Sequence, residues 1–198
     1  MIASDMSWIA LNQLGEGVVA PFVDTQTRTI EDGVRAISFG LSSAGYDLRL
    51  CPQEIFVPKA GVLLDPKHRN NRDNYDAVMS TLDRETGERY WDIPAGGSAL
   101  ALSVETITIP RECLGLCVGK STYARCGLIV NTTPLEPEWC GRLVIELHNV
   151  QANNPIRIYG DEGIAQLVLF KIDGPIFTSY ADRGGKYQNQ AEITPARA

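Results

Sequence analysis

Histidines and the common hydrolytic motifs are scarce in this sequence. Its 198 residues include two histidines, His68 and His148, so a metal site built from several histidines is not expected. The H-x-E and P-C-x-x-C elements of zinc-dependent nucleobase deaminases are missing. So are the G-x-x-x-x-G-K-[ST] phosphate-binding loop and the G-x-S-x-G nucleophile elbow. These absences exclude a zinc deaminase, a P-loop enzyme and a serine hydrolase of the elbow type.

Long apolar stretches are missing as well. Because no run of about 18 apolar residues occurs, no transmembrane helix or membrane partner is expected. The amino-terminal stretch contains Asp5 and lacks a basic region, so it does not resemble a signal peptide. An odd number of cysteines, five, indicates reduced thiols and a cytoplasmic protein. Cys113 and Cys117 lie in the apolar stretch CLGLC and are expected to be buried thiols rather than metal ligands.

Positive charge is in deficit. The chain has 18 Lys and Arg residues against 24 Asp and Glu residues, a net charge of −6 and a pI of about 5.0. Binding to duplex nucleic acid needs many cationic phosphate contacts, so no nucleic-acid partner is expected. One small anionic ligand held by a local basic cluster remains compatible with this composition. The length and the 44% hydrophobic content predict a single domain, 1–198, with a core that needs no disulfides.

Short apolar or alternating runs separated by turn residues make up most of the chain. The 18 glycines and 11 prolines punctuate these runs, a pattern typical of a β-sandwich, a jelly roll or a barrel. One amino-terminal helix is predicted over 4–14, with Met6, Ile9 and Ala10 on one face and Gly15 and Gly17 at its end. The expected strands cover residues 55–57, 99–107, 114–118, 128–130, 143–148, 156–159 and 165–172.

Two polar segments interrupt this rhythm. Residues 65–92 are predicted to form a long surface excursion with a helical turn near 75–82, which could be a lid, a subunit contact or a plain solvated loop. The tail from Tyr180 is also polar, and such tails are usually frayed. This tail nevertheless concentrates hydrogen-bond donors and aromatic rings, in Tyr180, Arg183, Lys186, Tyr187 and Gln190.

The sequence KSTYARCG, which begins at Lys120, is predicted to form a short helix. Ser121 and Arg125 are four positions apart, so they would share one face. Ser121 and Thr122 would lie at the amino end, where free N–H groups favour an anion, and Gly127 would end the helix. The segment therefore suits phosphate oxygens, although a capped surface helix without a ligand would show the same pattern.

The sequence RLVIELH, which begins at Arg142, is predicted to form a strand with one acidic residue. By the period of two, its leucines and isoleucine share one face, and Glu146 and His148 lie on the other. If the second face is buried, desolvation raises the pKa of Glu146, which prepares it for general acid–base chemistry. If that face is open to water, Glu146 is an ordinary surface residue. His148 is expected to be structural or solvent-facing rather than catalytic.

A turn with two prolines three residues apart joins these two segments. Pro134 and Pro137 restrict the backbone, so the turn could present its main-chain groups to the edge of a pyrimidine. A rigid connection without a ligand would have the same residues. Trp139 is expected in the core or at a subunit contact.

Taken together, these segments resemble the deoxycytidine triphosphate (dCTP) deaminase branch of the dUTPase-like superfamily. The match runs through nearly the whole chain. The central block GKSTYARCGLIVNTTPLEPEW and the tail SYADRGGKYQNQ are specific to that branch, and GRLVIELHN resembles the strand that carries its catalytic glutamate. The motifs SSAGYDLRL and DEGIAQLVLF are shared with dUTPases. The resemblance implies a distorted β-barrel or jelly roll with a short active-site helix, assembled as a homotrimer with active sites between subunits.

The resemblance also implies roles for individual residues. Glu146 would be the general base that activates water for attack on C4 of cytosine, and Ser121 and Arg125 would hold the water, the base and Glu146 in register. Glu136 stands where the family has an aspartate near the deoxyribose 3′-OH, which is a departure shared with a subset of the family. The tail 180–198 would close over the nucleotide. The implied substrate-binding residues are Lys120, Ser121, Thr122, Thr133, Pro134, Glu136, Tyr180, Lys186 and Gln190.

The implied reaction is hydrolysis of dCTP to dUTP and ammonia for pyrimidine deoxyribonucleotide synthesis. No metal would be bound by the protein itself; Mg²⁺ would accompany the triphosphate. The family is inhibited by dTTP, and the same is expected here. Two alternatives stay open. The first is a triphosphate hydrolase, which either also cleaves the dUTP it forms to dUMP and diphosphate or acts only as a dUTPase. The second is a nucleotide sensor that binds without turnover.

Overall fold

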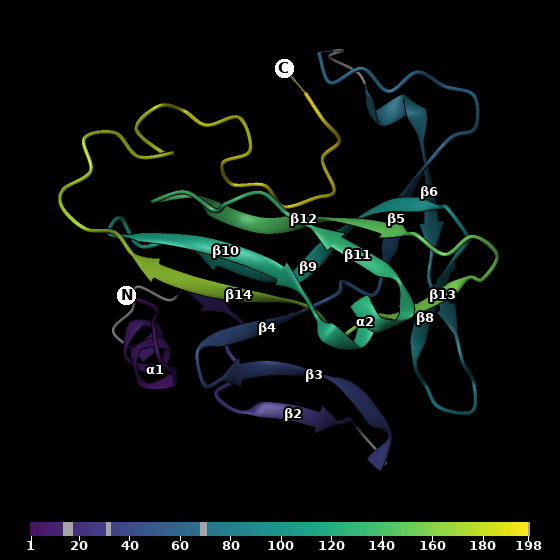
Figure 1. Cartoon of the computed structure of the whole chain (residues 1–198), viewed down its shortest axis with the longest axis horizontal. Coiled ribbons are helices and arrows are strands. Elements are labelled where there is room, and N and C mark those ends of the chain that lie inside the picture. The colour runs from purple at the N-terminus through teal and green to yellow at the C-terminus, as the bar shows by residue number, and fades with distance from the viewer. Residues whose placement is uncertain (14–17, 31–32, 68–70, 198) are drawn as a thin grey trace.

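The computed structural model describes residues 1–13, 18–30, 33–67 and 71–197. Antiparallel sheets are the main regular structure of these residues (Figure 1). The larger sheet has the order β11-β12-β9-β5-β6, with β1 paired to β9. Its strands are β11 (Leu128–Asn131), β12 (Cys140–Asn149), β9 (Ser98–Thr108), β5 (Glu54–Pro58), β6 (Tyr75–Met79) and β1 (Val19–Ala20).

The described part of the chain contains two further sheets. The second sheet has the order β10-β14-β4-β3-β2, and the third has the order β13-β8-β7. Their strands are β10 (Cys113–Gly119), β14 (Gly163–Lys171), β4 (Gly45–Arg49), β3 (Arg35–Ser42), β2 (Gln26–Thr29), β13 (Ile156–Tyr159), β8 (Arg89–Ile93) and β7 (Thr81–Leu82). The helical elements are α1 (Asp5–Gln13), α2 (Ser121–Cys126) and a 3₁₀ turn η2 (Asn71–Asn74).

The core lies between the two larger sheets. Alternate residues of β12 point inward, and Ile145 and Leu147 are almost fully buried. They belong to the same apolar cluster as Leu48 of β4 and Leu167 and Leu169 of β14. The mainly β architecture predicted from the runs and turns is confirmed, and every predicted strand is present. The outward face of β12, which carries Glu146, is left to form a wall of the site.

Three expectations need correction or limitation. In α1 the buried residue is Trp8, whereas Met6 and Ala10 are exposed and Ile9 is half-buried, so the predicted apolar face was wrong. The predicted end of that helix, at Gly15 and Gly17, lies outside the described residues, which stop at 13 and resume at 18.

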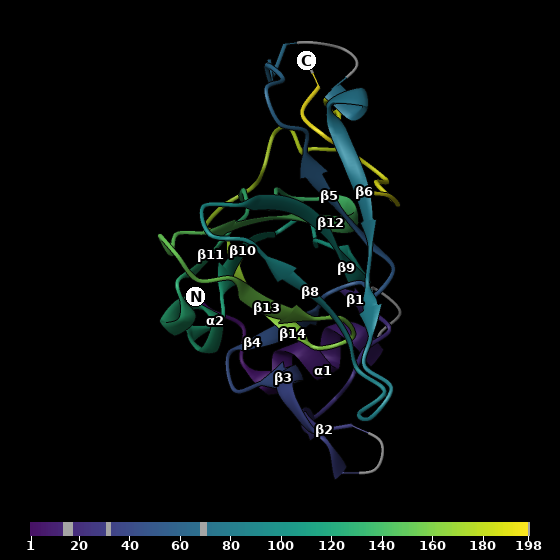
Figure 2. The ribbon, with the colours of Figure 1, turned by 90° about the vertical axis from the view of Figure 1, so that its right-hand side faces the viewer.

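The segment 65–92 is not a loop with a helical turn. The part predicted as helical forms the antiparallel strand β6, paired with β5, and the short strand β7, paired with β8. Figure 2 shows β6 running along one side of the molecule, with the segment that precedes it close to the carboxyl-terminal tail at one end. The excursion therefore brings Tyr75, at the start of β6, to the site described next.

Candidate active site

A cavity of about 290 Å³ lies on the outward face of β12. Its walls come from β12, from the proline-containing turn and from the carboxyl-terminal tail. Five residues that the sequence predicted for the site line this one cavity: Thr133, Pro134, Glu146, Tyr180 and Gln190. Segments that are far apart in the sequence thus meet here.

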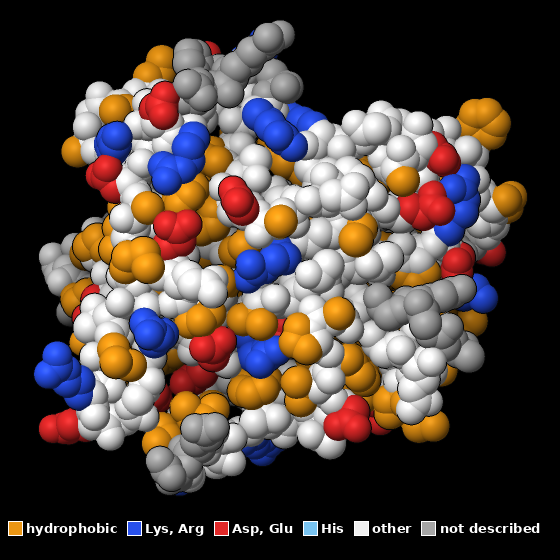
Figure 3. Space-filling view, turned by 180° about the vertical axis from the view of Figure 1, so that it is seen from behind, with side chains coloured by type: hydrophobic (Ala, Val, Ile, Leu, Met, Phe, Trp, Pro, Cys, Tyr) orange, Lys and Arg blue, Asp and Glu red, His pale blue; other side chains and the backbone are white. Residues whose placement is uncertain are grey.

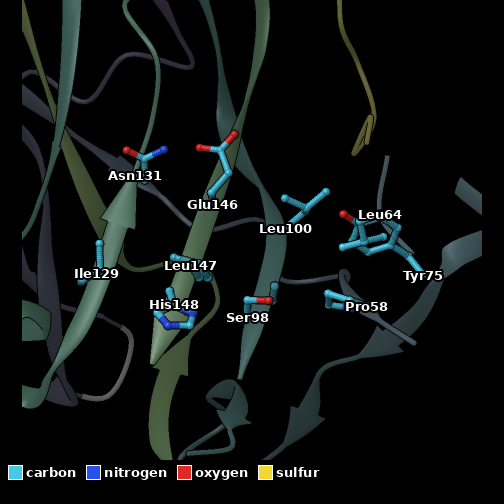
Figure 4. Close-up of a pocket in the computed structure, with 11 residues that line it drawn as sticks. Pro58, Leu64, Tyr75, Ser98, Leu100, Ile129, Asn131, Glu146, Leu147 and His148 are labelled. Carbon is cyan, nitrogen blue, oxygen red and sulfur yellow. The ribbon is translucent and has the colours of Figure 1, made fainter. Parts of the chain in front are cut away.

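Glu146 is the acidic residue of this wall. It is paired across the sheet with Asn131 of β11 and with Leu100 of β9, and Figure 4 shows its side chain standing between those two neighbours. The carboxyl group is half-buried, and its Oε2 has no hydrogen-bond partner among the described residues. Burial raises the pKa of Glu146 above 4.5, because the charged form loses hydration. The alternative of an ordinary surface glutamate is therefore not supported.

A second, smaller cavity of about 240 Å³ adjoins Glu146 on the side of His148 (Figure 4). Tyr75, Leu100 and Glu146 line both cavities, so the carboxyl group stands between them. Apolar side chains make up most of the second cavity's walls, which reinforces the desolvation of Glu146. His148 is exposed, as predicted.

The tail is held against the start of β12 rather than frayed. The Arg142 N–H donates to the Gln190 carbonyl at 2.7 Å, and the Gln190 side-chain amide donates to the Arg142 carbonyl at 2.9 Å. The indole N–H of Trp139 donates to the Tyr187 carbonyl at 3.1 Å, and Trp139 itself is buried, as predicted. Figure 1 shows the tail passing over β12. It forms one side of the cavity.

Two predicted ligand residues, Lys186 on the tail and Glu136 beside it, are not among the described residues that line the cavity. The Lys186 ammonium donates to the Arg197 carbonyl at 2.6 Å. The Glu136 carboxylate accepts a hydrogen bond from the Arg183 guanidinium. Both groups are exposed or half-buried, so a ligand could replace these contacts at little cost.

The predicted helix is present as α2, but it is not part of this cavity. Lys120 is its N-cap residue, and Gly127 ends it with a left-handed φ of 90°. Ser121, Thr122 and Arg125 are exposed, and none of them is among the described residues that line either cavity beside Glu146. The chain topology explains this separation, because α2 leads into the end of β11 that pairs with Asn149, whereas Glu146 pairs with the opposite end.

Lys120 is engaged in a buried polar cluster on the second sheet. Its ammonium donates to the Asp47 carboxylate at 2.5 Å and to the Ser38 hydroxyl at 3.1 Å. The Lys120 and Asp47 side chains are 10% and 3% exposed. Gln166 of β14 donates a further hydrogen bond to Asp47 at 3.3 Å. In this arrangement the cation is neutralised by its own chain, and a role with phosphate stays a prediction.

Sequence reasoning missed several wall residues. Tyr75 lay in a segment interpreted as a surface excursion, and Leu100 and Val144 carried no signal beyond strand alternation. Thr194 and Ala196 lie beyond the tail motif, in a stretch whose polar composition indicated nothing specific. The pairing of β5 with β6 and of β12 with β9 brings Tyr75, Leu100 and Val144 to one face of the sheet.

The donor groups present were also compared with the needs of a metal ion. Within the described residues, no group of three or more His, Cys, Asp or Glu side chains could hold one. Glu146 is the acidic side chain that lines the larger cavity, so these residues do not form an oxygen cage for Mg²⁺. Cys113 and Cys117 are buried free thiols, as predicted.

The outer properties of the chain are simple. No helix among the described residues has the length and apolar character needed to cross a membrane. Figure 3 shows Lys and Arg side chains interspersed with Asp and Glu side chains over the face opposite to that of Figure 1. This mixture agrees with the small net charge of the sequence.

The sequence is similar to those of known proteins. The sequence profile of the dCTP deaminase-like family matches residues 2–172. A dCTP deaminase of Roseiflexus castenholzii is 46% identical over 191 residues, which cover 96% of each protein. A dCTP deaminase of Alcanivorax borkumensis is 44% identical over 192 residues, again covering 96% of each.

The fold is also similar to that of a solved structure. The crystal structure of 2′-deoxycytidine 5′-triphosphate deaminase from Agrobacterium tumefaciens matches with a TM-score of 0.58 at 18% identity, over 89% of this chain. The present chain spans 49% of that longer chain, and at this identity the match supports the fold alone. The family profile and the near full-length relatives together show that the chain belongs to the dCTP deaminase family.

Proposed function

We propose that the protein hydrolyses dCTP to dUTP and ammonia. The observation that carries the proposal is Glu146, a half-buried carboxyl group with one oxygen that has no partner among the residues the structure describes. It lies in a cavity bounded by the turn and the tail that the resemblance assigned to the nucleotide. Its relatives named dCTP deaminase agree with this substrate. The same residues favour turnover over a sensor that binds without reaction.

The ionised Glu146 carboxylate would take a proton from a water molecule as the water oxygen bonds to C4 of cytosine. The protonated carboxyl would then deliver that proton to the amino group, and the C4–N bond would break to release ammonia. The proton of the added hydroxyl group would pass to N3, which leaves the C4 carbonyl and the N3–H of the uracil ring. A raised pKa suits the first step, because it makes the carboxylate a stronger base toward the water molecule. General acid–base catalysis of this kind contributes on the order of 10²–10⁴ in rate.

The turn and the tail would hold the nucleotide. Main-chain groups of Thr133 and Pro134 would contact the base, and Tyr180 and Gln190 would lie beside the sugar and phosphates, since all four residues line the cavity. Lys186 would exchange the Arg197 carbonyl for a phosphate oxygen, and Glu136 would face the 3′-OH. Mg²⁺ bound to the triphosphate would neutralise part of its charge. In this proposal 1–198 is one domain whose tail, 180–198, closes the site.

Ser121, Thr122 and Arg125 would come from a second copy of the chain. They are exposed on α2 and do not line the cavity of their own chain in the described part, so an oligomer with sites between subunits supplies what one chain leaves open. We propose a homotrimer with three shared sites. Lys120 would stay with Asp47 or exchange it for phosphate, and variants of Asp47 distinguish these roles.

The activity test is direct. The protein is incubated with dCTP and Mg²⁺, ammonia is measured and nucleotides are separated by chromatography. We expect dUTP and ammonia in equal amounts, and a loss on the order of 10²-fold or more for Glu146→Gln. An inert wild-type protein, or a Glu146→Gln variant with most of the activity, would contradict the proposal. A panel of dCTP, dCMP, CTP, 5-methyl-dCTP and dUTP defines the substrate range.

Shared sites are tested by mixing two inactive variants. Glu146→Gln and Arg125→Ala subunits are unfolded together, refolded and assayed at equal concentrations. If each site takes Glu146 from one chain and Arg125 from another, about one site in four is intact and activity returns. Each variant refolded alone is the control. No recovery, with mixed oligomers demonstrated by mass, would place all catalytic residues in one chain.

The same chromatography addresses the alternative chemistry. Appearance of dUMP and diphosphate from dCTP would indicate a bifunctional enzyme, and cleavage of dUTP without deamination would indicate a dUTPase. We propose further that dTTP inhibits by binding in the same cavity, which a competition assay with dCTP measures. The five free cysteines agree with a reducing, cytoplasmic setting.

A further inference from the structure

The tail continues past Gln190, the last of the predicted ligand residues, and its remaining part is docked. Residues 191–197, called the strap from here on, contact the six-stranded sheet through Ile193. Within the strap Ile193 is 7% exposed. Phe177, an apolar residue in the preceding connection, is 99% exposed. Ile193 and Pro195 are the buried residues of the strap, and its other described residues are exposed or half-buried. The burial of Ile193 is thus a specific apolar contact of the tail.

Ile193 lies in an apolar slot on the outward face of the larger sheet. It packs with Cys51, Phe56 and Leu102, all of which are buried. Half-buried side chains complete the slot, and Tyr75, Leu100 and Val144 among them also line the larger cavity beside Glu146. The slot and the cavity therefore share a wall.

The rest of the strap is fixed relative to the same cavity. Thr194 and Ala196 line it directly. The Asn71 side-chain amide donates to the Ala196 carbonyl at 2.7 Å, which connects the strap to the segment before β6. The Arg197 carbonyl accepts the hydrogen bond from the Lys186 ammonium. The position of the strap thus determines both a cavity wall and the surroundings of Lys186.

We propose that Ile193 is a positioning residue that anchors the tail in its nucleotide-binding arrangement. It contacts no reacting atom; it acts by holding the strap, and through the strap Lys186 and the Tyr187–Gln190 stretch, against β12. The effect of Ile193 on nucleotide binding rests on the proposed function. The docking of the tail by Ile193 does not. Removal of the apolar side chain shifts the tail toward an undocked state, because burial of an isoleucine supplies a large share of the free energy that holds so short a segment.

The test uses the full chain with Ile193→Ser, Ile193→Val and a protein ending after Gln190. For Ile193→Ser we expect the KM for dCTP to rise on the order of tenfold, with a smaller change in kcat, because the docked tail must form before binding is productive. The truncated protein should match Ile193→Ser, and Ile193→Val should restore most of the wild-type KM. Phe177→Ser, which removes an exposed apolar side chain, is the matched control and should behave as wild type.

A second readout needs no catalysis. Trypsin cleavage after Lys186 should be faster in Ile193→Ser and in the truncated protein than in wild type and Phe177→Ser, at unchanged thermal unfolding midpoints. An unchanged KM in Ile193→Ser would overturn the proposal, whether or not cleavage is faster. If Ile193→Ser fails to fold, the truncated protein decides by the same two measurements. If wild type does not deaminate dCTP while cleavage still depends on Ile193, the proposed function fails and the anchor remains.

Discussion

The Glu146 region and the Asp47 region place carboxylates in opposite surroundings. Asp47, 3% exposed, accepts hydrogen bonds from the Lys120 ammonium at 2.5 Å and from Gln166 at 3.3 Å. Glu146 is also withdrawn from water, yet its Oε2 has no hydrogen-bond partner in the described part of the chain, and the walls beside it are mainly apolar. A buried charge with a partner stabilises structure only as part of the pair, whereas a desolvated carboxyl group without one is available for proton transfer.

The largest expected effect concerns the ion pair between Asp47 and Lys120. Asp47→Asn leaves the Lys120 ammonium buried without a counter-ion, so the free energy of unfolding should fall by about 3 kcal/mol or more. Urea unfolding measures it, with Glu146→Gln as the matched carboxyl-to-amide control. Combining Asp47→Asn with Lys120→Met should recover much of the loss. Equal stability of Asp47→Asn and wild type would show that the pair is not a buried interaction in solution.

The pH dependence of activity tests the catalytic half of this comparison. Glu146 must be ionised to accept a proton, and burial raises its pKa above 4.5. The value of kcat/KM for dCTP should therefore decrease about tenfold for each pH unit below that raised pKa. A pH series of initial rates locates the acidic limb. A limb at or below 4.5 would show that the carboxyl group is hydrated in the free enzyme.

A smaller effect of opposite sign concerns stability at Glu146. Because its pKa is higher in the folded than in the unfolded chain, ionisation costs stability as pH rises through the folded-state value. Glu146→Gln should therefore unfold at a higher temperature than wild type at pH 8. The difference should vanish below pH 4.5, where the wild-type carboxyl group is protonated in both states. Thermal scans at both pH values check this trade between stability and function.

The smallest effect is expected for an ion pair that is exposed to solvent. Arg183 and Glu136 are paired with side chains 49% and 40% exposed. Solvent screening limits such pairs, so Arg183→Ala should change the free energy of unfolding by less than about 1 kcal/mol. Urea unfolding beside Asp47→Asn gives the contrast on one scale. A loss comparable to that of Asp47→Asn would mean that exposure does not separate the two kinds of pair.

Much of the fold was predictable from local pattern, and the failures have physical causes. Strands such as β12 alternate apolar and polar residues because one face is buried, and that alternation is readable. β6 was missed because most of its residues are exposed and it is held by pairing with β5. In α1 the burial of Trp8 depends on its packing near Tyr46, with ring centroids 6.1 Å apart, which the helical period does not reveal.

The site was predictable to a different extent. The outward face of Glu146 follows from strand alternation, and the resemblance supplied the turn and tail residues that meet it in one cavity. The Lys120–Asp47 pair joins residues 73 positions apart on different elements, and the Ile193 slot joins β5, β9 and the strap. Such long-range contacts depend on the sheet order, which periodicity cannot provide.

The separation of α2 from the cavity has a consequence for the enzyme in dilute solution. In the proposed oligomer, where one chain supplies Arg125 and another supplies Glu146 to each site, an isolated subunit would be folded but inactive. Specific activity would then decline as protein concentration falls below the dissociation constant of the oligomer, and excess substrate that bridges two chains would delay the decline.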